Sequence, residues 1–148
     1  MTDDEDSIRD VLTVWSQMFA DQAWSEWSQL FTPDGTFTTA TGRTFVGRDA
    51  LGASWGGIEE QDGRHPQVTY VCAPAVIRIA GDTARAASDH VAYVRASADA
   101  AWQILTVGRL LHTLVRQHGG WQISDVREWG YFSTPETLAP LPSVVRDG

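Results

Sequence analysis

The sequence predicts an α+β fold in which a long, curved antiparallel sheet wraps around helices from the N-terminal part of the chain. Two observations predict it: amphipathic helical patterns come first, and long strand-like runs between tight turns fill the rest. Strands of this length twist, so the sheet curls around helices packed on one face. The 148 residues favour a single domain. We expect it to span residues 1–148, with a core at about 7–132 and an irregular tail at 133–148.

Three helices are expected in the first part of the chain. From residue 7 to 19, apolar residues recur at spacings of three and four, and the acidic run at 3–6 stands where the helix dipole favours negative charge. A second, short helix at 23–31 ends at the Thr-Pro-Asp-Gly turn signal of residues 32–35. A third begins near Asp49, and its glycines predict a short element.

The remaining chain is predicted to be strand. A small hairpin at 36–47 surrounds a Thr-Gly turn, and a loop follows at 59–66. The turns Gly81-Asp82 and His-Gly-Gly at 118–120 then separate long runs, which predicts an antiparallel meander. These runs cover residues 67–80, 83–97, 102–117 and 121–132.

Charge and composition exclude several classes of function. The net charge is −8, and all eleven cations are arginines scattered singly, so neither nucleic acid nor an anionic membrane is an expected partner. The lone Cys72 cannot form an internal disulfide, and no spacing indicates a metal site. The acidic N-terminus lacks signal-peptide features and no apolar run approaches a membrane span, so we expect a cytoplasmic protein.

Seven tryptophans are more than a core of this size needs. Tryptophan combines a large apolar area with an N–H group that requires a partner, so it suits pocket walls and interfaces. A tryptophan-rich core is the alternative, and composition leaves both interpretations open.

Five segments, in this order, resemble the nuclear-transport-factor-2-like superfamily, in particular its SnoaL-like polyketide-cyclase and scytalone-dehydratase-like branches. They are FADQAWSEWSQLFTPDGTF, FVGRDAL, IRIAGDTARA, VGRLLHTLVRQHGGWQI and REWGYF, within residues 8–132. The resemblance implies a cone-shaped, cystatin-like roll with a pocket between the helices and the concave sheet. It also implies dehydratases, isomerases or cyclases, usually without metal or organic cofactor, beside members that only bind ligands.

Asp21 is the first catalytic candidate that the resemblance implies. Dehydratase-like members carry an Asp at the end of the first helix that points into the cavity. A carboxylate among Trp15, Phe19 and Trp24 would be desolvated, which raises its pKa towards that of a useful acid or base. The alternative is a helix-terminal Asp in solvent.

His112 is the second candidate. The branch commonly shows Gly-Arg-Tyr-x-Asp where this chain has Leu110 for the Tyr and His112 for the Asp. The two-residue period of a strand places both on one face, together with Gly108 and Leu114. If that face is concave, His112 reaches the cavity and can exchange protons. A satisfied core histidine is the alternative.

His90 and Tyr70 complete the polar candidates. His90 shares a strand face with small residues, whereas charged residues mark the opposite, solvent face, so His90 is expected to point inward. Tyr70 falls roughly where related dehydratases carry an active-site histidine. Its phenol suits a hydrogen bond to a substrate oxygen, and a packed tyrosine is the alternative.

The pocket walls and the last strand complete the predicted site. On the last strand, regular alternation brings Asp125 and Arg127 inward, whereas a bulge after Ser124 would bring Val126 and Glu128 inward instead. The pattern leaves both open. The expected substrate-binding residues, besides Tyr70, are Trp15, Phe19, Trp55, Leu110 and Trp129.

The predicted function is a cofactor-free acid–base enzyme of the dehydratase, isomerase or cyclase type, acting on a small hydrophobic oxygenated metabolite. The alternative is a non-catalytic, ligand-binding or accessory protein of the same fold. A second apolar face opposite His112 predicts a homodimer through the outer face of the sheet. That face carries Leu105, Val107, Leu111 and Val115.

Overall fold

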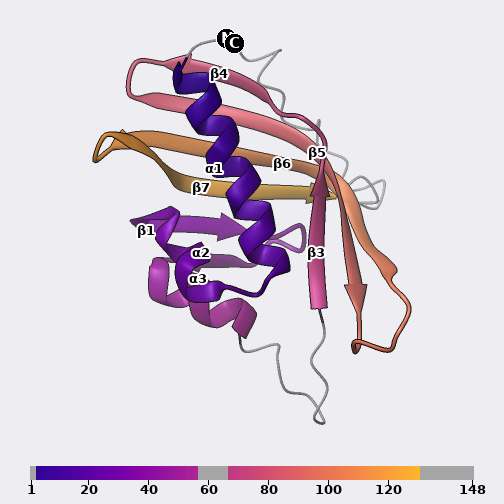
Figure 1. Cartoon of the computed structure of the whole chain (residues 1–148). Helices are drawn as coiled ribbons and strands as arrows, with labels where there is room; N and C mark the ends of the chain where they lie inside the picture. Colours follow the sequence, from indigo (N-terminus) through magenta and orange to yellow (C-terminus); the bar gives the residue numbers. More distant parts are fainter. Residues whose placement is uncertain (1–2, 57–66, 131–148) are drawn as a thin grey trace.

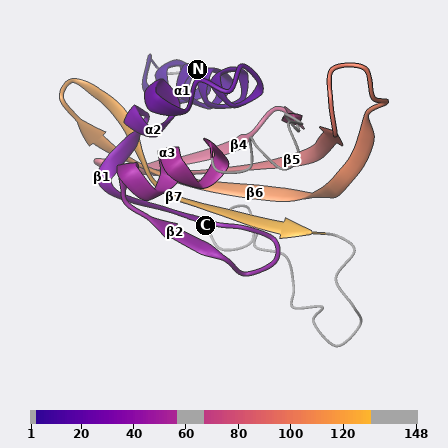
Figure 2. The ribbon, with the colours of Figure 1, turned by 90° about the horizontal axis from the view of Figure 1, so that it is seen from below.

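The computed structural model describes residues 3–56 and 67–130, in which the helices lie on one side of a curved seven-stranded sheet (Figures 1 and 2). The α+β fold class is confirmed. The predicted loop at 59–66 and the predicted tail lie outside the described residues. The helices are α1 (Asp3–Ala20), α2 (Trp24–Gln29) and α3 (Arg48–Gly56). The strands are β1 (Phe31–Thr38), β2 (Thr44–Val46), β3 (Gln67–Cys72), β4 (Val76–Ala80), β5 (Thr83–Arg95), β6 (Gln103–Gln117) and β7 (Gly120–Gly130).

Helix α1 crosses the concave face of the sheet (Figure 1). It begins at Asp3, because the acidic residues 3–6 form its first turn, where their charge complements the helix dipole. Its inner face carries Ile8, Trp15 and Phe19, each at most 1% exposed. Burying each of these side chains contributes roughly 1.5–3 kcal/mol, so packing on the sheet rather than helix propensity holds α1 in place.

The strands run in the order β2-β1-β7-β6-β5-β3, and β4 also pairs with β5. The predicted antiparallel meander is confirmed for β5, β6 and β7. Strands β1 and β7 pair in parallel, so the prediction of a purely antiparallel sheet is wrong at this pair. No hairpin joins them, and the sequence pattern therefore does not fix their relative direction. Residues 32–35, predicted as a turn, lie within β1, where its register with β7 is irregular.

Two interruptions of the predicted strands, one break and one β-bulge, decide which side chains face the helices. Residues 73–75 divide the predicted strand at 67–80 into β3 and β4, both of which pair with β5. In β7, Ser124 is an extra residue opposite the junction of Thr113 and Leu114, which is a β-bulge. The bulge reverses the alternation beyond it: Val126 is fully buried and Glu128 is 8% exposed. Of the two facings that the sequence allows, the structure has Val126 and Glu128 inward.

The interior near α2 and β1 is packed with aromatic rings. Trp27, Phe31, Phe37 and Leu51 of α3 have no exposed surface, and we call this group the aromatic end. The ring centroid of Trp27 lies 5.0 Å from that of Phe31 and 6.4 Å from that of Phe37. Such pairs add to the stabilisation from burial alone. For this part of the molecule, the interpretation of the tryptophans as core residues is correct.

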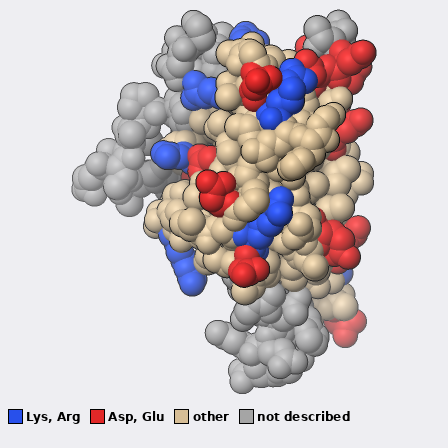
Figure 3. All heavy atoms as spheres, turned by 90° about the vertical axis from the view of Figure 1, so that its left-hand side faces the viewer, with Lys and Arg blue, Asp and Glu red and all other residues tan. Residues whose placement is uncertain are grey.

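On the face seen in Figure 3, red and blue groups lie side by side near the top, and further red groups follow the right-hand edge. Within residues 3–56 and 67–130, no helix is long and apolar enough to cross a membrane. In the same ranges, no three His, Cys, Asp or Glu residues come together as metal ligands.

Candidate functional site

Four polar side chains face the helices from the concave face of the sheet. They are Tyr70 on β3, His90 on β5, His112 on β6 and Glu128 on β7, and we call them the polar cluster. Each is at most 8% exposed. The inward facing of His90 that strand alternation predicts is confirmed, and the face that carries His112, which the pattern left open, is the concave one. Four neighbouring strands therefore each contribute one titratable group to the same interior.

The two imidazoles of the polar cluster are buried without partners. Neither ring nitrogen of His90 or His112 has a hydrogen-bond partner within the described part of the chain. Burial lowers the pKa of His112 to about 3, with a further lowering by His90, and burial lowers the pKa of His90 to about 4 against the opposing charge of Asp89. Both rings are therefore neutral near pH 7, and each offers one hydrogen-bond donor and one acceptor.

Tyr70 and Glu128 form a buried phenol–carboxyl pair. The Tyr70 hydroxyl donates a hydrogen bond of 2.6 Å to Oε2 of Glu128. Burial raises the pKa of Glu128, and the hydrogen bonds from Tyr70 and from the backbone N–H of Ala40 oppose that rise. The Tyr70 ring lies 5.3 Å from the His90 ring, between centroids. The Tyr70 ring therefore lies between the Glu128 carboxyl group and the His90 imidazole. A carboxyl group with a raised pKa suits proton exchange.

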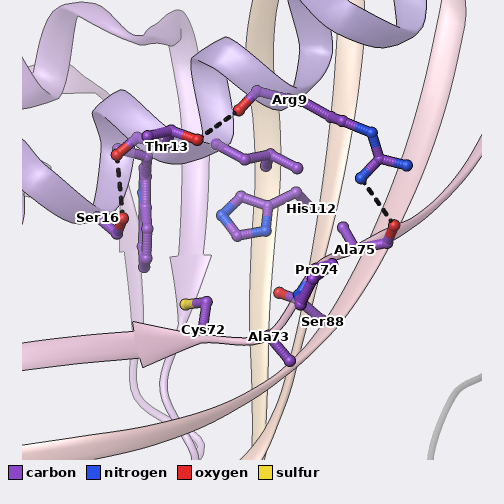
Figure 4. Close-up of a pocket in the computed structure, with 11 residues that line it drawn as sticks. Arg9, Thr13, Ser16, Cys72, Ala73, Pro74, Ala75, Ser88 and His112 are labelled. Carbon is purple, nitrogen blue, oxygen red and sulfur yellow. Dashed lines mark hydrogen bonds between the residues drawn. The ribbon is translucent and has the colours of Figure 1, made fainter. Parts of the chain in front are cut away.

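A cavity of about 390 Å³ opens between α1 and residues 72–75 and reaches His112 (Figure 4). Its volume lies at the lower end of the roughly 300–1,000 Å³ that is typical of small-molecule sites. His112 forms part of its wall, whereas both ring nitrogens of His112 are enclosed by the protein. Helix α1 contributes Arg9, Leu12, Thr13, Trp15 and Ser16, the opposite wall Cys72, Ala73, Pro74 and Ala75, and the sheet Ser88 and His112.

Asp21 does not join this site. The prediction that its carboxylate lies among Trp15, Phe19 and Trp24 is wrong, because Asp21 is exposed. Helix α1 ends at Ala20, and the chain reverses through Gln22, whose φ is +56°. The carboxyl group that the interior does contain is that of Glu128.

The predicted pocket walls divide into three groups. Trp15 lines the cavity, and its ring packs edge-on against that of His112, with 4.8 Å between the ring centroids. Phe19 and Leu110 are fully buried in the core and do not line the cavity. The side chain of Trp55 lies outside what the structure describes.

Trp129 lies on the opposite face of the sheet, so its prediction as a pocket-mouth residue is wrong. It packs against Ala87 and Leu111 on the outer face. The bulge at Ser124 that turns Glu128 inward turns the next residue outward, which explains the error.

Sequence reasoning missed several residues at the cavity, although two of them had a signal. Ser88 shares the strand face of His90, and Cys72 shares that of Tyr70, so alternation places both inward. Burial raises the pKa of the Cys72 thiol to about 11, so it is protonated near pH 7 and is a poor nucleophile. Arg9, Thr13 and Ser16 follow helical spacing beside the apolar stripe of α1, which the search for apolar periodicity alone did not detect.

The fold and this cavity define an α+β protein in which a long helix covers the concave face of a curved sheet and a cavity opens beside the helix. The model of the SnoaL-like domain matches residues 1–127, and the chain therefore belongs to the SnoaL-like domain family. A search of curated proteins found no match.

Solved structures share the fold at low sequence identity. One is an NTF2-like protein with a cystatin-like fold from Novosphingobium aromaticivorans, with 21% identity over 90% of this chain and 85% of that chain and a TM-score of 0.73. A candidate scytalone dehydratase from the same organism has 19% identity over 88% and 85% of the two chains and a TM-score of 0.73. A protein from Catenulispora acidiphila in complex with S-DNPA has 16% identity over 84% and 92%, with a TM-score of 0.70.

Proposed function

We propose that this protein is a cofactor-free acid–base enzyme of the dehydratase, isomerase or cyclase type. Its substrate is a small hydrophobic oxygenated metabolite that enters the cavity and meets His112. The observation that carries the proposal is the pair of buried imidazoles, His90 and His112, whose four ring nitrogens have no partner among the described residues.

The energetics of burial support a functional role for this pair. A buried polar group without a hydrogen bond costs roughly 1–3 kcal/mol, and apolar residues of similar size would avoid that cost. Unpaired polar groups that a fold retains in its interior are typical of ligand-binding and catalytic sites. A hydroxyl or carbonyl group of a bound ligand supplies the missing partner.

In the proposed chemistry, the histidines of the polar cluster transfer one proton, and Glu128 with Tyr70 transfers the other. In a dehydration, an imidazole removes the proton next to a substrate carbonyl, and the hydroxyl group leaves as water after it receives a proton. The carboxyl group of Glu128, which accepts a hydrogen bond from the Tyr70 phenol and whose pKa is raised by burial, can hold or return a proton. Glu128 thus replaces Asp21 in the proposed mechanism. The relatives in this fold that carry a dehydratase name or a bound organic molecule support the substrate class.

A panel of cyclic β-hydroxyketones tests the proposal, because their dehydration to enones changes the ultraviolet absorbance. We expect His112→Gln and His90→Gln each to lower turnover by roughly 10²–10⁴-fold, as for other positioned acid–base groups. Asp10→Asn, an exposed carboxylate on α1, is the matched control and retains wild-type turnover. Near-wild-type rates in both histidine variants would eliminate the mechanism.

Ligand binding without catalysis is the second candidate, and the low pKa values of both histidines favour it. An imidazole with a pKa of about 3 or 4 is a weak base, so it suits hydrogen bonding better than proton removal. A ligand that binds tightly and is recovered unchanged after long incubation with the wild-type protein would support this candidate over the enzyme.

A homodimer through the outer face of the sheet completes the proposal. Val71, Val91 and Val107 form a row across β3, β5 and β6 on that face, and Val71 is 59% exposed. Apolar residues on both faces of a strand indicate that both faces are covered. Light scattering at micromolar concentration is expected to give the mass of a dimer, and Val107→Glu that of a monomer. A monomeric wild-type protein would contradict this.

A further inference from the structure

The cavity beside α1 reaches only one member of the polar cluster. His112 lines the cavity, whereas the other three members do not (Figure 4). His90 nevertheless lies directly opposite Cys72 in the register of β3 and β5, and Cys72 lines the cavity. The cavity and the enclosed part of the polar cluster are therefore neighbouring spaces, separated by side chains.

Trp15 stands at this boundary. Besides His112, it is the one aromatic residue among the described residues that line the cavity. Its ring centroid lies 4.8 Å from that of His112, which it meets edge-on, and 5.4 Å from that of Tyr70. One ring therefore contacts a member of the polar cluster that borders the cavity and a member that does not.

The Trp15 indole is held in this place by packing and not by a hydrogen bond. Its Nε1 is buried and has no hydrogen-bond partner within residues 3–56 and 67–130. The neighbouring rings of Phe19 and Phe37 lie 5.9 and 6.3 Å away, between centroids. A helical tryptophan has two favoured values of χ1, and the adjoining cavity of about 390 Å³ gives the indole space to turn. Such a turn breaks no hydrogen bond, and it allows the unpaired N–H group to find a partner.

We propose that Trp15 is a gate between the cavity and the polar cluster: a ligand enters beside α1 and reaches the imidazoles and the Tyr70–Glu128 pair when the indole turns aside. The inference rests on the proposed function for the ligand that passes, whereas the gate itself is tested without one. It adds an entry route to the proposed site and the residue that controls it.

A gate at Trp15 accounts for imidazoles that are both unpartnered and enclosed. The ring nitrogens of His90 and His112 have no hydrogen-bond partner in the described structure and are covered by the protein, so a ligand bonds them only after a side chain moves. When the indole turns towards the cavity, the volume that it leaves adjoins both His112 and Tyr70. A ligand in that volume has the imidazole on one side and the phenol on the other.

Chemical modification of the histidines tests the gate in the full chain. Diethyl pyrocarbonate transfers an ethoxycarbonyl group to unprotonated imidazole nitrogens, and mass spectrometry of peptides gives the rate at each histidine. Near pH 7, we expect the exposed His118 of wild type to react fast and His90 and His112 to be protected. Trp15→Leu keeps an apolar side chain and removes the ring. It is expected to raise the rates at His90 and His112 by about tenfold or more, because protected groups otherwise react only through rare local opening.

Phe19→Leu is the matched control. Phe19 is also fully buried, and its ring centroid lies 4.8 Å from that of Tyr70, but it does not line the cavity. Its replacement removes a ring from the same core, so it is expected to lower the thermal stability while the rate at His112 stays within about twofold of wild type. His118 is the internal reference in every variant. If Trp15→Leu fails to fold, Trp15→Phe, which reduces the ring, is expected to give a smaller rise with the same pattern.

The titration of His112 supplies a readout that a loss of packing alone does not move. Burial holds the pKa of His112 at about 3, so its ring signals in nuclear magnetic resonance are expected to stay constant between about pH 5 and 8 in wild type and in Phe19→Leu. In Trp15→Leu, water reaches the imidazole and raises its pKa towards the ordinary value of 6.5, so the signals titrate in this range.

Two results would overturn the proposal. One is a folded Trp15→Leu protein in which His90 and His112 are as well protected as in wild type. The other is an equal gain of reactivity in Trp15→Leu and Phe19→Leu, which would mean that any loss of packing exposes the polar cluster. Neither result depends on turnover. If the gate pattern is observed and the histidine variants retain turnover, the enzyme proposal fails and the gate remains.

Discussion

The aromatic end and the polar cluster occupy neighbouring parts of one interior, yet they are built on opposite principles. At the aromatic end, apolar and aromatic side chains without exposed surface pack together, and the indole N–H of Trp27 is its one buried polar side-chain atom. In the polar cluster, four titratable groups are buried, and two of them have no partner among the described residues. Trp15 touches both regions, with ring centroids 6.3 Å from Phe37 and 4.8 Å from His112. The difference lies in titratable groups: the aromatic end has none, whereas the polar cluster, where we propose the functional site, has four.

The largest expected effect is at the aromatic end. Phe37→Ala is expected to lower the free energy of unfolding by about 3–5 kcal/mol, because it leaves a cavity among rings that have no exposed surface. Urea denaturation measures the change. If the loss were below about 1 kcal/mol, the aromatic end would not be the stabilising region that the comparison requires.

The second effect is the pH dependence of stability that comes from the two histidines of the polar cluster. Unfolded histidines bind protons below about pH 6.5, whereas His90 and His112 in the folded protein stay neutral down to about pH 4 and 3, so stability falls as the pH falls through this window. The expected loss is roughly 1–2 kcal/mol per histidine between about pH 6.5 and 5. Glu128, whose folded pKa is raised, contributes in the opposite direction.

Denaturation curves of wild type and of the double variant His90→Leu/His112→Leu at several pH values isolate this contribution. The carboxylates titrate in both proteins, so the difference between the two curves belongs to the histidines. Identical pH dependence in the two proteins would show that the imidazoles are not desolvated.

The third effect reverses the usual outcome of a core substitution. His112→Leu near pH 7.5 is expected to leave the free energy of unfolding unchanged or to raise it by about 1–2 kcal/mol, because it removes an unpaired buried polar group. It also removes the proposed site. A stability loss above about 2 kcal/mol in chemical denaturation would mean that His112 has a structural partner and would weaken the comparison.

The smallest effect concerns neither region. Arg116 pairs with Asp4 at 2.7 Å and stacks on Trp121, which ties the start of α1 to β6 and β7. Since exposed ion pairs contribute about 0–1 kcal/mol, Arg116→Met is expected to lower the free energy of unfolding by no more than about 1 kcal/mol. A loss above about 2 kcal/mol in urea denaturation would show that this contact anchors α1 more strongly than an exposed pair does.

Much of the architecture and half of the polar cluster could be predicted from the sequence, because both follow from regular periods. Alternation predicted the inward facing of His90 and that His112 shares a face with Leu110, and apolar spacing predicted α1. The wrong predictions of side-chain facing lie where a β-bulge interrupts the two-residue alternation of a strand. The bulge at Ser124 has no signature in its local residues, since Ile, Ser, Asp and Val all suit a regular strand, and it alone decides the facing of Glu128 and Trp129.

Helix ends are a second place where local patterns stop being informative. Asp21 follows the last turn of α1, and its direction depends on the reversal at Gln22 rather than on helical spacing. The cavity itself could not be predicted, because it arises where α1 and residues 72–75 stand apart on the assembled sheet.

The parallel pairing of β1 with β7 joins Phe31 to Ile123, two residues far apart in the sequence. Contacts of such long sequence separation form slowly, so we expect a refolding chain to pair β1 with β7 after the neighbouring strands β5, β6 and β7 have joined. Until then, the rings of Phe31 and Phe37 lack the strand that lies beside them in the folded protein.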